Sequence, residues 1–149
     1  LMMLTLVPSI VYQYTLPREA SGNKNTNLQI ISILISIILT IFVIIFGPMA
    51  SSFIFPKFVD AINVIQIMSL AIIPISISLV FNSKFLSIEK SRYTIIGSGI
   101  FLTVQITMIL LLGEYYGIIG ISSAIVIASI FETVFLVIMY KLKINTDKN

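Results

Sequence analysis

The sequence contains no cysteine, no histidine and no tryptophan. Without cysteine no disulfide bond can form, and without cysteine or histidine no metal centre built from thiolates or imidazoles is possible. The absence of histidine also removes the Ser-His and His-Asp pairs used by intramembrane serine proteases and membrane acyltransferases. No Gly-x-x-x-x-Gly-Lys phosphate loop, no Gly-x-Gly-Asp protease motif and no pair of membrane carboxylates occurs. We therefore expect neither an enzyme nor a bound cofactor.

Charged residues are also scarce, at only 10% of the 149 residues, whereas a soluble domain usually carries about 25%. Nine Lys and Arg residues and six Asp and Glu residues leave a formal net charge of +3. The basic residues are spread over short polar segments and do not cluster. This distribution is typical of the loops of membrane proteins, and it excludes nucleic acid as an expected partner.

Apolar residues are abundant: 58% of the chain is hydrophobic, and the mean hydropathy is +1.10. A helix needs about 20 mostly apolar residues to cross ~30 Å of hydrocarbon. We predict an all-α membrane protein, a single bundle of about five transmembrane helices over residues 1–149. The predicted helices cover about residues 1–16, 28–50, 60–83, 93–113 and 117–140, and a cytoplasmic tail follows at 141–149.

The first apolar stretch is shorter than the others. Residues 1–16 end at Pro17, after a helical rise of about 24 Å, which is less than a full crossing. We expect this stretch to be the end of a span whose beginning is absent, so that the chain is truncated at its N-terminus. The alternative is a kinked or re-entrant segment around Pro8.

The loops differ strongly in their number of basic residues, which orients a membrane protein. Three segments on one predicted side hold eight Lys and Arg residues, and the other side holds only Lys57. We therefore expect a multi-pass protein of the cell membrane with a cytoplasmic C-terminus. The eight basic residues are Arg18, Lys24, Lys84, Lys90, Arg92, Lys141, Lys143 and Lys148.

One acidic residue, Glu132, lies deep in a predicted span. It continues a stripe of small residues formed by Gly120, Ala124 and Ala128 at four-residue spacing, which lets a neighbouring helix approach closely. Glu132 is about 12 Å inside the helix end at Tyr140, where a charge needs a partner, water or a proton. It is either a structural partner of a neighbouring helix or a group that lines an aqueous cavity and binds a proton or cation.

Other polar residues form stripes on the predicted spans. Asn63 and Gln66 share one face of residues 60–83, and Pro74 is expected to kink this helix near mid-membrane. Gln105 lies on a similar stripe. Such stripes serve either interhelical hydrogen bonding or a hydrated substrate or ion pathway. The other polar residues on these stripes are Ser32, Ser36, Thr40, Ser78, Thr94 and Ser98.

Several short stretches occur in a distinctive order over nearly the whole chain. They are Ile45-Phe46-Gly47-Pro48, Phe55-Pro56-Lys57-Phe58, Ala61-Ile62-Asn63-Val64-Ile65-Gln66-Ile67, Asn82-Ser83-Lys84-Phe85-Leu86-Ser87-Ile88-Glu89-Lys90 and Tyr115-Tyr116-Gly117-Ile118-Ile119-Gly120-Ile121-Ser122-Ser123-Ala124. In this order the chain resembles the C-terminal part of the polysaccharide (O-antigen-type) flippases of the multidrug/oligosaccharidyl-lipid/polysaccharide exporter superfamily. It departs from that family at Glu89, where glycine is usual, and at Ser122 and Ser123, which replace alanines.

The resemblance implies two six-helix lobes around a cavity, of which this chain would supply the last five of twelve spans. The implied activity is movement of an isoprenoid-pyrophosphate-linked glycan across the membrane by alternating access. The implied partners are membrane lipid, the lipid-linked oligosaccharide and the missing N-terminal lobe of the same transporter. Lys84 is the candidate contact of the pyrophosphate, or else an ordinary basic anchor at the helix end.

Two other functions remain open from the sequence. One is a cation-coupled multidrug exporter of the same superfamily, which substrate competition in vesicles would distinguish from a flippase. The other is a small membrane protein that does not transport and binds partner helices.

Overall fold

The computed structural model describes residues 10, 13, 26–54 and 61–146. Of these residues, 96% are helical and none is in a strand, which confirms the all-α class. The helices are α2 (Thr26–Ile54), α3 (Ala61–Leu70), α4 (Ile72–Ser87) and α5 (Ser91–Thr146). The predicted helix at residues 1–16 lies outside the described residues, apart from Ile10 and Gln13.

The segment predicted as one helix over residues 60–83 is divided into α3 and α4, with Ala71 between them. The backbone N–H of Ala71 donates to the carbonyl of Met68 at 3.2 Å, a bond that spans three residues instead of four. Pro74 has no N–H, so the carbonyl four residues before it loses its usual partner. The change from α3 to α4 therefore lies where the proline interrupts the hydrogen-bond ladder.

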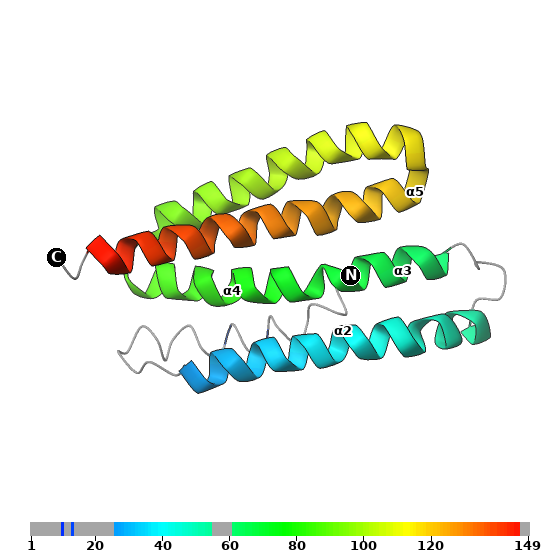
Figure 1. Cartoon of the computed structure of the whole chain (residues 1–149), viewed down its shortest axis with the longest axis horizontal. Coiled ribbons are helices and arrows are strands. Elements are labelled where there is room, and N and C mark those ends of the chain that lie inside the picture. The colour runs from blue at the N-terminus through cyan, green and yellow to red at the C-terminus, as the bar shows by residue number, and fades with distance from the viewer. Residues whose placement is uncertain (1–9, 11–12, 14–25, 55–60, 147–149) are drawn as a thin grey trace.

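The helices predicted at residues 93–113 and 117–140 are the two arms of α5, residues 91–116 and 118–146, joined by a sharp reversal at Gly117 (Figure 1). Gly117 has φ 56° and ψ −130°, a conformation open to residues that lack a Cβ. Three residues later, a Cβ on Gly120 would collide with the backbone carbonyl of Leu112. The two glycines therefore permit a reversal with no separate loop.

The helix α4 ends in a left-handed cap at Glu89, which has φ 57°. The N–H of Lys90 donates to the carbonyl of Phe85 at 2.8 Å, and the N–H of Glu89 donates to the carbonyl of Leu86 at 3.1 Å. This pair of bonds is a Schellman motif, whose left-handed position is usually glycine. Glu89 therefore occupies a position where the backbone conformation favours glycine.

The helices α3 and α4 lie between α2 and α5 (Figure 1). The contacts between these four helices are formed largely by small side chains. Ala124 and Ala128 have no exposed surface, and Gly120 is buried as well, so the stripe of small residues faces protein. Small residues on one face let helix backbones approach closely. The large residues of the core are Ile72, Phe85 and Leu136.

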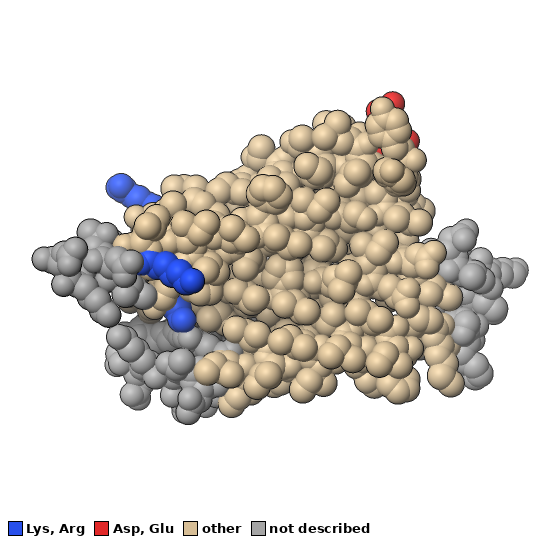
Figure 2. Space-filling view, in the orientation of Figure 1, with Lys and Arg blue, Asp and Glu red and all other residues tan. Residues whose placement is uncertain are grey.

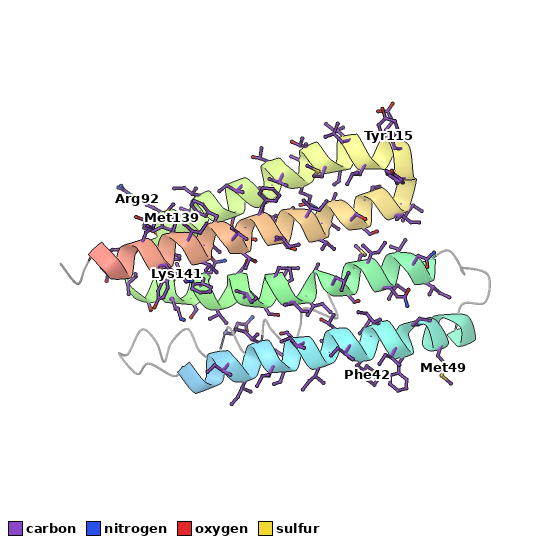
Figure 3. All side chains as sticks on the ribbon, in the orientation of Figure 1. Phe42, Met49, Arg92, Tyr115, Met139 and Lys141 are labelled. Carbon is purple, nitrogen blue, oxygen red and sulfur yellow. The ribbon has the colours of Figure 1, made fainter. Side chains whose placement is uncertain are left out.

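Uncharged residues cover most of the visible outer surface, and charged residues lie at its ends (Figure 2). Many of the exposed side chains are large and apolar. Arg92 and Lys141 lie at one end of the molecule, and Tyr115 lies at the opposite end (Figure 3). Two helical segments, Ile62–Ser87 and Ser91–Leu142, are long and apolar enough to cross a membrane, and Ile33–Met49 is a shorter apolar helix.

Candidate functional site

Glu132 lies where three helical segments meet. It belongs to the second arm of α5, and its carboxyl group lies beside the side chain of Asn82 from α4, within reach of the amide as a hydrogen-bond donor. Its Cγ is 3.7 Å from the point that a Cβ on Gly97 would occupy, on the first arm of α5. The same point is 3.1 Å from Cδ2 of Leu136. Gly97 thus leaves just enough room for the second arm to bring the half-buried Glu132 against the first.

The amide of Asn82 is only partly used by this contact. Its Oδ1 is buried and has no hydrogen-bond partner among the described residues. Because a carboxylate only accepts hydrogen bonds, the amide group that it contacts is Nδ2, the donor. A buried polar atom without a partner costs about 1–3 kcal/mol, so it calls for an explanation. The hydroxyl oxygen of Thr94 is the other buried side-chain atom in the described ranges without a partner.

A second polar contact lies next to Glu132 in the sequence. The hydroxyls of Thr133 and Ser78 are 2.7 Å apart, and Thr133 Oγ1 is also 2.7 Å from the carbonyl oxygen of Pro74. These atoms are buried, and their contacts connect α4 to the second arm of α5. Glu132 and Thr133 therefore both direct polar groups to α4.

Sequence reasoning did not single out Asn82 as a site residue. The signal was available, because Ser78 and Asn82 are four residues apart and therefore share one face of a helix. Both of these residues contact the second arm of α5. Asn82 was part of a longer motif, and nothing in a single sequence indicates which helix lies opposite that face.

Lys84 makes different contacts. Its Nζ is 5.0 Å from the ring centroid of Phe81 and 5.0 Å from that of Tyr140. Phe85 packs against Tyr140 and Tyr93 with centroid distances of 5.9 and 5.0 Å. Cation–π contacts of this kind hold the ammonium group in place between α4 and α5.

These contacts set Lys84 apart from Glu132. Tyr140 is eight residues after Glu132, which is about 12 Å along the helix. The structure therefore does not join Lys84 and Glu132 into one site. The aromatic contacts favour an anchoring role for Lys84, and its contact with a pyrophosphate stays a prediction.

Gln66 and its neighbours form a polar seam between α2 and the two middle helices. Gln66 Nε2 donates to the carbonyl of Ile44 at 3.2 Å. The Ser36 hydroxyl donates to Ser76 at 2.6 Å, and Thr40 donates to the carbonyl of Ser69 at 3.3 Å. Each of these side chains has a hydrogen-bond partner on a neighbouring helix, so this seam favours interhelical packing over a ligand pathway.

The two remaining candidates are not joined to Glu132. Asn63 is exposed on the first turn of α3, and Gln105 is half-buried on the first arm of α5. No hydrogen bond connects either of them to Glu132 within the part of the chain that the structure describes. The described part of the chain contains no group of three or more His, Cys, Asp and Glu side chains that could hold a metal ion. The carboxyl–amide pair of Glu132 and Asn82 is therefore the best candidate site for chemistry.

No protein-family model, no curated protein and no solved structure matches this chain. Its function is therefore inferred from the sequence pattern and from the geometry around Glu132.

Proposed function

We propose that the chain is an integral membrane protein that forms the C-terminal part of a lipid-linked oligosaccharide flippase. In this proposal it moves an isoprenoid-pyrophosphate-linked glycan across the cell membrane by alternating access, together with an N-terminal lobe of the same transporter. The glycan specificity comes from the sequence resemblance. The membrane location and the transport activity each have physical support of their own.

The membrane location is supported by the apolar surface. Exposed large hydrophobic side chains occur along α2 and along both arms of α5, whereas a soluble monomer rarely exposes a contiguous apolar patch above a few hundred Å². Each arm of α5 rises roughly 40 Å, enough to cross ~30 Å of hydrocarbon. Lipid chains solvate such a surface without the cost that water would impose. Examples of these side chains are Ile38, Ile45, Met49, Ile95, Leu110 and Ile118.

The orientation is supported by the charges at the two ends. Arg92 and Lys141 lie at one end, and Tyr115 lies at the other (Figure 3). Lys84 and Lys90 precede Arg92 closely in the sequence, and Glu114 is next to Tyr115. Basic residues at one membrane face mark the cytoplasmic side. In this proposal the end that carries Arg92 and Lys141 is therefore cytoplasmic.

The observation that carries the transport proposal is the position of Glu132. It lies within an apolar helix, held between Asn82 and Gly97. Ionisable residues within membrane spans are costly and commonly belong to ion or substrate pathways. A protein that served only to pack helices would not need this acid, because the stripe of small residues already provides the packing surface.

The direct test is complementation. Cells that lack their own glycan flippase should recover glycan export when they express the full-length protein, and should not recover it with a matched variant that has a stop codon before Ser91. Competition by cationic drugs for transport in vesicles, without glycan export, would instead establish the multidrug exporter. Expression in the membrane with neither activity would contradict the transport proposal.

A further inference from the structure

The number of hydrogen bonds that the carboxyl group of Glu132 and the amide of Asn82 can share depends on whether the carboxyl group is protonated. In the ionised form, the carboxylate can accept a hydrogen bond from Nδ2 but can give nothing to Oδ1. This leaves the buried Oδ1 of Asn82 without a partner, as the structure shows it among the described residues. The ionised pair thus carries two penalties, a charge inside an apolar helix and an unsatisfied acceptor.

Protonation removes both penalties in one step. A carboxylic acid and a primary amide can form a cyclic pair, in which the acid carbonyl accepts from Nδ2 and the acid O–H donates to Oδ1. The carboxylate takes its proton from hydronium, which becomes water, and no other reactant is needed. The unpartnered Oδ1 of Asn82 is therefore the acceptor that a protonated Glu132 requires.

We propose that Glu132 and Asn82 form a proton-binding site that joins α4 to the second arm of α5. The proton neutralises the acid and lets the side chains of Glu132 and Asn82 share two hydrogen bonds instead of one. This inference deepens the proposed function and rests on its membrane location, since it supplies the group that would couple transport to a proton gradient.

In the described helices the other charged residues lie away from Glu132, which leaves a proton to neutralise its carboxylate. The helices α2 and α3 contain no charged residue. On α4 the only charged residue is Lys84, whose ammonium group lies against the rings of Phe81 and Tyr140. On the first arm of α5, Gly97 faces Glu132, and the charged residues of the two arms lie towards their ends. Those residues, with the tyrosines near them, are Arg92, Tyr93, Glu114, Tyr115, Tyr116, Tyr140, Lys141 and Lys143.

Infrared difference spectroscopy of the full-length protein in lipid vesicles tests the site without any transport measurement. A protonated carboxyl group has a C=O stretch distinct from that of a carboxylate. In a pH titration we expect a protonated-carboxyl band that is lost in Glu132→Gln, a variant that keeps the shape of the acid. The same band should persist in the control Glu114→Gln, since Glu114 is exposed at the reversal of α5.

A second variant tests the role of the amide. In Asn82→Leu the acid O–H loses its acceptor, so the C=O stretch of Glu132 should move to higher frequency. A protonated-carboxyl band that is absent from the wild-type protein, or undiminished in Glu132→Gln, would overturn the proposal. An unchanged frequency in a folded Asn82→Leu variant would also overturn it. Should the band belong to Glu132 while glycan export is not restored, the transport proposal fails and the proton site stands.

Discussion

Glycine residues let the two arms of α5 approach each other closely, and the closest approach is at Gly120. A Cβ at this position would overlap the carbonyl of Leu112, which is backbone and cannot move aside as a side chain can. We expect Gly120→Ala to lower the free energy of unfolding in detergent by about 1–3 kcal/mol, the usual cost of overpacking. The control is Gly99→Ala, because nothing lies within 4 Å of its Cβ position.

In that control the substitution replaces an exposed helical glycine, so it should be neutral or should stabilise by up to about 1 kcal/mol. Equal effects of the two substitutions, measured by denaturant titration of the purified protein, would contradict the close approach at the reversal.

Glu132 is the residue with the clearest expected effect on activity. Glu132→Gln keeps the size and hydrogen-bonding capacity of the protonated acid but cannot exchange a proton. Transport by the full-length protein should fall and lose its dependence on pH, while the amount of protein in the membrane stays the same. Wild-type transport with an unchanged pH profile would leave Glu132 with a structural role only.

At the scale of the helix, the end of α4 contains a local conflict. Glu89 is held at φ 57°, where a residue with a Cβ pays about 1–2 kcal/mol. Glu89→Gly should therefore raise the free energy of unfolding by about 1 kcal/mol. The matched control is Glu114→Gly, which places glycine within an arm of α5 and should lower it by about 1 kcal/mol. Thermal denaturation of the two variants in the same detergent should give shifts of opposite sign.

The helices themselves were accessible from the sequence, because long apolar runs predict spans without knowledge of their neighbours. The connections between the helices were harder to predict from the sequence. The sequence predicts a turn over residues 114–116, whereas the structure keeps these residues helical and reverses at Gly117. Only the conformation of Gly117 and the contact of Gly120 with Leu112 show that the arms join without a loop. Pro74 indicated a disturbance of the third predicted helix, yet the division falls at Ala71, since a proline affects the turn that precedes it.

Only one of the two residues of the candidate site could be predicted from the sequence, for a related reason. Glu132 could be found because an acid in an apolar run is conspicuous. Asn82 could not be assigned to it, because the pairing depends on how α4 and α5 are rotated against each other. The same limit applies to Gln66, whose partner is a backbone carbonyl on α2, a group that exists at every position of every helix.

At the scale of the whole molecule, we propose one central property, the passage of the helices through a membrane with the basic end in the cytoplasm. The apolar outer surface, the length of the arms of α5 and the charges at the two ends all support this proposal. Without a membrane, the same surface would drive aggregation in water.

Cysteine labelling in intact cells tests this property most directly, and the absence of native cysteine makes each introduced thiol a unique probe. With a membrane-impermeant thiol reagent, Tyr115→Cys at the reversal of α5 should react, whereas Ser91→Cys and Asn145→Cys at the two ends of α5 should react only after lysis. Asn23→Cys, in the polar segment before α2, should also react only after lysis. Labelling of Asn145→Cys before lysis, or equal labelling of Tyr115→Cys and Ser91→Cys in intact cells, would contradict the account.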